Sequence, residues 1–110
     1  MIGPTELTPR QRKHLRGLAH ALEPTVRVGR AGVTTEVAAE TDRTLEAHEL
    51  IKVKIEAEGS ERRAGLAAEL ARRTAAALVG TIGKIAILYR RREKKPKIEL
   101  PRSEPFPSRR

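Results

Sequence analysis

The sequence predicts a single α/β domain in which helices pack against a mixed four-stranded sheet. The chain has 110 residues, 38% of them hydrophobic, which suits one domain with a modest core. Segments with the period of a strand alternate with segments with the period of a helix, and two strand-like segments follow each other at the end. The predicted order is therefore α-β-α-β-α-β-β.

The first helix is predicted to begin at Thr8, which can cap it, with Pro9 at the first helical position and Gln11 completing a capping box. Apolar residues then recur at the spacing of one helix face: Leu15, Leu18, Ala19 and Leu22. Pro24 is expected to stop this helix.

Residues 25–28 form a short β-type run that leads into a glycine-rich loop. Thr34 or Thr35 can then cap a second helix. The inward face of this helix is predicted to carry Val37, Thr41, Leu45 and His48. Residues 51–55 alternate apolar side chains with lysines, which predicts a half-buried strand with an outward basic row.

A third helix is predicted for roughly residues 61–78, after the break at Gly59 and Ser60. Its core face would carry Leu66, Leu70, Thr74 and Leu78. Residues 78–82 and 85–89 are predicted to be the last two strands. Gly83 and Lys84 between them fit a two-residue turn.

The chain is strongly basic, with 23 Lys and Arg against 14 Asp and Glu, a net charge of +9 and an isoelectric point near 10.8. Such a field attracts polyanions, and nucleic acid is the commonest polyanion in a cell. The only aromatic residues are Tyr89 and Phe106. A stacking platform of aromatic rings is therefore excluded, and contacts to nucleic acid must rely on backbone amides, arginine and lysine.

The division expected from composition is a domain over residues 1–92 and a mobile, basic, proline-rich tail over residues 93–110. Prolines at four positions break any helix in the tail. Ile98 and Leu100 are the tail residues expected to dock locally.

The loop of Gly29, Arg30, Ala31 and Gly32 lies between a predicted strand and a predicted helix. Glycines permit positive φ and remove the side chains that would keep a ligand from the backbone. The following helix N-terminus offers unpaired N–H groups and partial positive charge. Arg30 can add a bidentate contact to phosphate. The loop is thus a candidate clamp for a sugar-phosphate backbone, as in KH domains.

Four stretches in order along the chain resemble the CRM-domain family, especially its bacterial stand-alone YhbY-like members: Arg12 to His20, Val28 to Thr34, His48 to Lys54 and Ile82 to Arg90. The resemblance covers about residues 8–90. It implies a fold related to the C-terminal domain of bacterial translation initiation factor three, with a KH-like loop. It also implies RNA binding, and for bacterial members a precursor of the large ribosomal subunit as partner. Plant relatives act in group II intron splicing.

One departure from the family is that Arg90, Arg91 and Arg92 continue into a long basic tail where the family often turns to proline. The residues expected to contact RNA are Gly29, Arg30, Ala31, Gly32, Arg12, Lys13, Arg16, His20, Arg27, Lys52, Lys54 and Lys84.

Other functions find less support in the sequence. No serine, histidine and carboxylate are placed to act together, so we expect no enzyme. The chain has no cysteine and its three histidines are scattered, so we expect no cofactor or metal. No apolar run approaches the roughly 20 residues that span a bilayer, and we expect a cytoplasmic monomer. The alternatives left open are a protein-interaction module that docks an acidic partner and, with less support, a duplex DNA binder.

Overall fold

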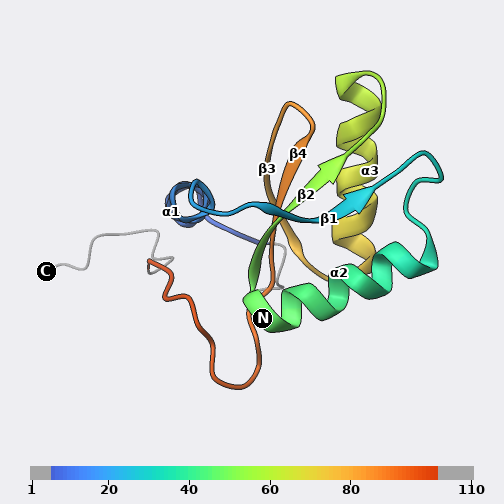
Figure 1. The fold of residues 1–110 in the computed structure, drawn as a ribbon. Helices are drawn as coiled ribbons and strands as arrows, with labels where there is room; N and C mark the ends of the chain where they lie inside the picture. The colour runs from blue at the N-terminus through green and yellow to red at the C-terminus, as the bar shows by residue number, and fades with distance from the viewer. Residues whose placement is uncertain (1–5, 102–110) are drawn as a thin grey trace, which may run out of the picture.

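The structure, a computed structural model, describes residues 6–101. Its elements follow the predicted order: α1 Pro9–Ala19, β1 Pro24–Val28, α2 Thr35–His48, β2 Leu50–Ile55, α3 Ser60–Arg73, β3 Ala77–Ile82 and β4 Ile85–Tyr89. The strands form one four-stranded sheet in the order β1-β2-β4-β3 (Figure 1). β1 and β2 are parallel and are joined through α2, whereas β4 is antiparallel to both of its neighbours. The predicted mixed sheet is confirmed.

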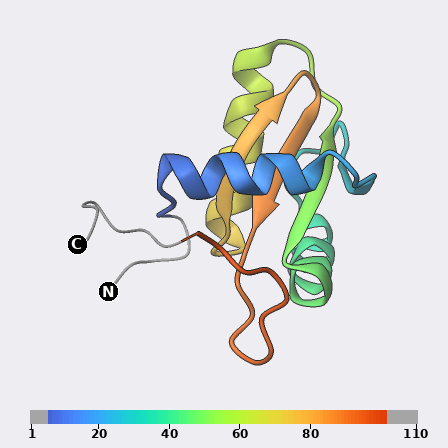
Figure 2. The same ribbon diagram turned by 90° about the vertical axis from the view of Figure 1, so that its left-hand side faces the viewer.

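Helices cover both faces of the sheet (Figure 2). α1 crosses one face, while α2 and α3 lie against the other. Side chains along β2 alternate between these faces, because Leu50 packs with α1 residues and Ile51 belongs to the cluster beneath α2 and α3. Lys52 and Lys54 therefore project on the α1 side, and both are half-buried. The predicted basic row exists, but a helix partly covers the face that carries it.

The start of α1 is confirmed in detail. Thr8 Oγ1 accepts from the amide of Gln11 at 3.1 Å, and Gln11 Oε1 accepts from the amide of Thr8 at 3.1 Å, which is the predicted capping box. The predicted end was wrong, because α1 ends at Ala19 and Pro24 instead begins β1. Leu18 was expected on the inward stripe but is 42% exposed, since only the narrow face of the helix meets the sheet.

The predicted inward position of His48 and the predicted end of α3 also needed correction. His48 was expected inside but is exposed, because the chain leaves the helix there and Glu49, with φ at 66°, is buried in its place. α3 ends at Arg73, so neither Thr74 nor Leu78 extends its core face as predicted. Thr74 is the buried C-cap, and Leu78 packs into the core from β3. Ala75, with φ at 55°, follows the C-cap.

The chain beyond β4 packs back onto the domain, and we call residues 90–101 the C-terminal strap. The buried carboxylate of Glu49 accepts from three strap amides, those of Arg92 at 2.8 Å, Lys97 at 2.9 Å and Ile98 at 2.8 Å. Ile98 and Leu100 pack beside the core cluster under α1, as expected. The packing continues to residue 101, so it does not end at the boundary expected between residues 92 and 93. The rest of the expected tail lies outside the described residues.

Two residues at the end of β4 are held inside the fold. The guanidinium of Arg90 lies 2.6 Å from a carboxylate oxygen of Asp42 and donates to the carbonyl of Thr74 at 2.8 Å, which ties α2 to the chain after α3. Tyr89 is 3% exposed, and its ring belongs to the cluster under α1. Burial, together with the nearby negative charge of Glu49, raises the pKa of the Tyr89 hydroxyl.

Candidate nucleic-acid interface

The glycine-rich loop forms a tight turn at the end of β1. The amide of Gly32 donates to the carbonyl of Gly29 at 3.0 Å, which closes the turn. Thr34 is the N-cap of α2 and accepts from the amide of Val37 at 3.1 Å, so the first of the two predicted caps is the one used. Arg73 donates to the carbonyl of Val33 at 2.6 Å and anchors the end of the loop to α3.

The two glycines of the loop meet different demands. Gly32 is buried with φ at +82°, and a Cβ there would contact Leu66 at 3.7 Å, so its backbone conformation favours glycine. Gly29 has a negative φ, and a Cβ there would meet nothing within 4 Å. The fold thus explains the glycine at position 32. The glycine at position 29 leaves open space over the backbone, which suits a ligand that approaches it closely.

Arg30 and Ala31, at the tip of the loop, are exposed. Their amides donate to no acceptor within residues 6–101, and the Arg30 guanidinium forms no ion pair there. The loop therefore presents unpaired N–H groups and a solvent-facing cation at one point. This combination binds anionic oxygens, because both kinds of donor favour negative charge.

A row of side chains crosses the α1 face of the sheet beside the loop. The strand registers pair Arg27 with Lys54, Lys54 with Ile85, and Ile85 with Ile82. Arg27 and Lys54 share Glu56 as a counter-charge, at 3.4 and 4.0 Å. This one carboxylate leaves the row with a net positive charge.

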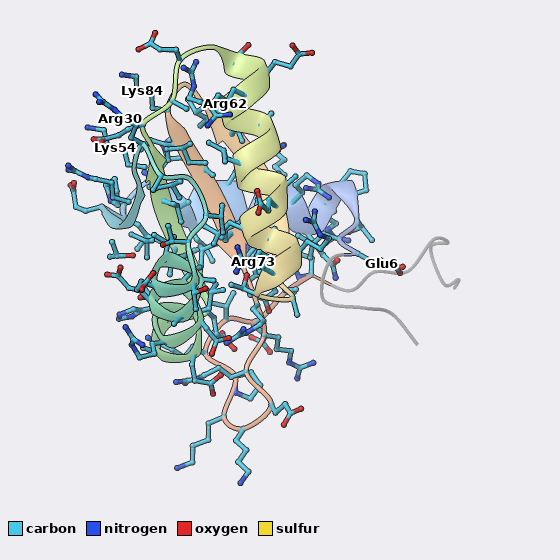
Figure 3. All side chains as sticks on the ribbon, turned by 90° about the vertical axis from the view of Figure 1, so that its right-hand side faces the viewer. Glu6, Arg30, Lys54, Arg62, Arg73 and Lys84 are labelled. Atoms are coloured by element: carbon cyan, nitrogen blue, oxygen red, sulfur yellow. The ribbon has the colours of Figure 1, made fainter. Side chains whose placement is uncertain are left out.

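The hairpin tip between β3 and β4 lies at the same end of the sheet. The amide of Ile55 donates to the carbonyl of Lys84 at 2.7 Å, which joins the tip to the end of β2. Figure 3 shows the side chains of Arg30, Lys54 and Lys84 close together at this end of the molecule. Three separate segments thus bring predicted site residues together.

The second half of α1 forms a groove with the sheet next to this row. Lys13, Arg16 and His20 line it from the helix, and Lys52 lines it from β2. Lys52 also donates to the carbonyl of Leu22 at 3.1 Å. These four predicted site residues are therefore brought together. Sequence reasoning missed two other lining residues, Gly17 and Ile82, although a glycine inside a predicted helix is a signal that it could have used.

Arg12, another predicted site residue, has a clear structural task. Its guanidinium donates to the carbonyls of Leu78 at 2.6 Å and Val79 at 3.0 Å, where an irregularity in the register interrupts the pairing of β3 with β4. Two arginines of α3 also form hydrogen bonds to neighbouring segments. Arg63 donates to the carbonyls of Ala57 at 2.9 Å and Gly83 at 3.1 Å, and Arg73 holds the loop.

Residues 6–101 contain neither a candidate metal cluster nor a helix that could span a membrane. No group of three or more histidine, aspartate or glutamate side chains is placed to hold a metal ion within that range. No helix in the same range has the length and apolar content needed to cross a membrane.

A family model described as CRS1 / YhbY (CRM) domain matches residues 7–90. The chain belongs to this family. The matched residues of this CRM domain include α1, β1, the glycine-rich loop, β2 and the β3–β4 hairpin, which together carry the candidate interface. The resemblance found in the four sequence stretches is confirmed.

Similar proteins come from distant bacteria. This CRM domain is 45% identical over 98 residues to an RNA-binding protein of Haemophilus influenzae, which covers 89% of this chain and 98% of that one. It is 37% identical over 95 residues to the probable RNA-binding protein YqeI of Bacillus subtilis, covering 86% and 99%. The solution structure of the hypothetical protein SAV1595 from Staphylococcus aureus has the same fold, with a TM-score of 0.79, 35% identity, and coverage of 87% of this chain and all of that one.

Proposed function

We propose that this protein binds RNA, with the glycine-rich loop on the sugar-phosphate backbone and the basic residues beside it on neighbouring phosphates. The observation that carries the proposal is the convergence of Arg30, Lys54 and Lys84 at one end of the sheet (Figure 3). The names of the Haemophilus and Bacillus relatives support RNA as the ligand.

The chemistry of the loop explains how the contact would form. A phosphate can approach the backbone at Gly29, because no side chain stands over that residue. The amides of Arg30 and Ala31 would then donate to its oxygens, and the Arg30 guanidinium would add a charge-assisted, bidentate contact. Lysines on the sheet and hairpin would neutralise the phosphates that follow along the RNA strand.

The side chains along α1 extend this surface. Lys13, Arg16 and His20 are exposed and line the same groove as Lys52, so the RNA would pass from the loop across the sheet to the helix. Arg12 contributes indirectly, because its guanidinium is committed to the carbonyls of β3. Tyr89 is buried and so is withheld from base stacking.

We propose further that the RNA is ribosomal RNA in precursors of the large ribosomal subunit, and that the protein acts in the cytoplasm as a monomeric assembly factor without catalytic activity. The support for this finer assignment is the resemblance to bacterial stand-alone members of the family.

The first experiment compares two charge reversals by filter binding to a ribosomal RNA fragment. Arg30→Glu is expected to weaken binding about tenfold or more, since it replaces an attractive phosphate contact with repulsion. Arg43→Glu is the matched control, because Arg43 is equally charged and exposed but lies on α2, away from the loop. Equal effects of the two reversals would mean that only net charge matters and that the loop is not the site.

The second experiment is ultraviolet crosslinking in cells, with sequencing of the attached RNA. Reads concentrated on large-subunit ribosomal RNA, and lost with Arg30→Glu, are expected. Reads spread over messenger and transfer RNAs would retain RNA binding and remove the ribosomal role. Partners that survive RNase, with no crosslinks above background, would favour a protein-interaction module instead.

A further inference from the structure

An isoleucine lies exposed in the middle of the basic surface. Ile82 is 63% exposed. Among residues 6–101 the other exposed large hydrophobic residue is Leu18, at 42%. Ile82 ends the cross-strand row that begins with Arg27 and Lys54. Its side chain also lines the groove beneath α1. Packing within the domain gives no reason for an apolar side chain there, because most of its surface faces solvent.

The groove therefore combines an apolar part with a cationic rim. Ile82 and Ile87 supply apolar surface from the hairpin. Lys13, Arg16 and Lys52 supply positive charge around it. The Arg16 side chain lies across Gly80, 3.8 Å from where a Cβ would stand, so the cation is held close to the sheet.

We propose that this groove receives the base of one unpaired RNA nucleotide, and that the protein consequently prefers RNA with an unpaired nucleotide over continuous duplex. This inference rests on the proposed function and assigns a second contact to the same surface. The flat face of a base would lie on Ile82, while the flanking phosphates would meet the cationic rim.

The chemistry distinguishes a nucleotide from other occupants. A base is an apolar plate joined to an anionic backbone, and the groove offers apolar surface within a positive field. In an A-form duplex the bases are stacked and paired, and the major groove is too deep and narrow for side chains to read. Only a loop, bulge or strand end would deliver a base to Ile82. The aliphatic surface here would serve as aromatic rings do in other single-strand binders.

The test measures binding of the full chain by fluorescence anisotropy to two RNA hairpins that differ in one bulged nucleotide. The wild type is expected to bind the bulged hairpin about fivefold to tenfold more tightly than the continuous one, as one base contact would give. Ile82→Ser should bring the ratio of the two affinities close to one, with little change for the continuous hairpin. Leu18→Ser is the matched control, since Leu18 is also an exposed apolar residue, at 42%, but lies outside this groove.

Equal wild-type affinity for the two hairpins, or an unchanged preference in Ile82→Ser, would overturn the inference and leave RNA binding intact. Failure to bind either hairpin would overturn the proposed function as well.

Discussion

Separate substitutions of the two loop glycines, Gly29 and Gly32, should have different effects on the stability of the fold and on RNA affinity. Gly32→Ala places a Cβ on a residue with φ at +82°, where an L-residue costs about 1–2 kcal/mol. The new Cβ would meet Leu66 only at ordinary contact distance, 3.7 Å, so no clash adds to this cost. The free energy of unfolding should therefore fall by about 1–2 kcal/mol, mainly from backbone strain.

Gly29→Ala should have the opposite effect on stability. Its φ is negative and the space above it is empty, so alanine adds no strain and reduces the entropy of the unfolded chain. The free energy of unfolding should rise by about 0.4–1 kcal/mol. The same methyl group would occupy the space that we assign to the RNA backbone, and RNA affinity should fall about tenfold, equal to about 1.4 kcal/mol.

The assay for both variants is urea unfolding followed by circular dichroism at 222 nm, together with filter binding to one ribosomal RNA fragment. The variants should move in opposite directions in the urea titration, and Gly29→Ala alone should combine a more stable fold with weaker binding. If Gly29→Ala is destabilised as much as Gly32→Ala, the structural distinction between the glycines is wrong. If it binds RNA as the wild type does, the space over residue 29 is not used by the ligand.

Four further results are expected. RNA affinity should fall steeply as the salt concentration rises. Arg30→Glu should make the slope of the logarithm of the binding constant against the logarithm of the salt concentration shallower by about 1 or more. An unchanged slope would mean that Arg30 does not contact phosphate. Glu49→Gln should lower the free energy of unfolding by about 2 kcal/mol, because an amide NH2 would face at least one of the three strap N–H donors. A change below about 0.5 kcal/mol would show that the carboxylate does not hold the strap. Arg12→Met should lower the free energy of unfolding by about 1.5 kcal/mol, because two β3 carbonyls lose their hydrogen-bond donor. The affinity of the folded variant for RNA should stay near the wild-type value. A large loss of affinity would assign Arg12 to the interface. Tyr89 is the only tyrosine, so absorbance at 295 nm should follow its ionisation alone, above the unfolded value of 10.0 because burial and Glu49 raise its pKa. This contribution to stability is complete below pH 10.0 and is lost as the pH rises through the higher folded value; native titration at 10.0 would contradict the buried position.

Local patterns in the sequence were sufficient for the order of the elements and for the cap of α1. Alternation and helical spacing record which side chains are buried, and the Thr8 capping box involves residues three apart. The exposure of His48 at the end of α2 and the end of α3 at Arg73 were not predicted. The chain turns next to them at Glu49 and Ala75, whose φ values of 66° and 55° are positive although neither residue is glycine. Tertiary packing sets such conformations, and residue type gives no warning of them.

The candidate site was predicted where it depends on short motifs and less well where it depends on distant contacts. The loop at residues 29–32 could be recognised because its glycines and its position before a helix are local features. The structural task of Arg12 depends on carbonyls 66 and 67 residues away, so its charge alone suggested RNA. Ile82 was assigned to a strand, but its exposure follows from where α1 crosses the sheet, which no local pattern records.

The bond between Glu49 and the strap also has a consequence for synthesis of the chain. Its three donors lie 43, 48 and 49 residues further along, so the carboxylate emerges during translation long before the amides that satisfy it. A buried charge without its partners is costly, and the nascent chain therefore cannot close this part of the core until the strap is made. Translation that stopped inside the strap would yield a chain holding the loop and the hairpin but unable to complete its fold. Only products that contain the strap would then compete for RNA.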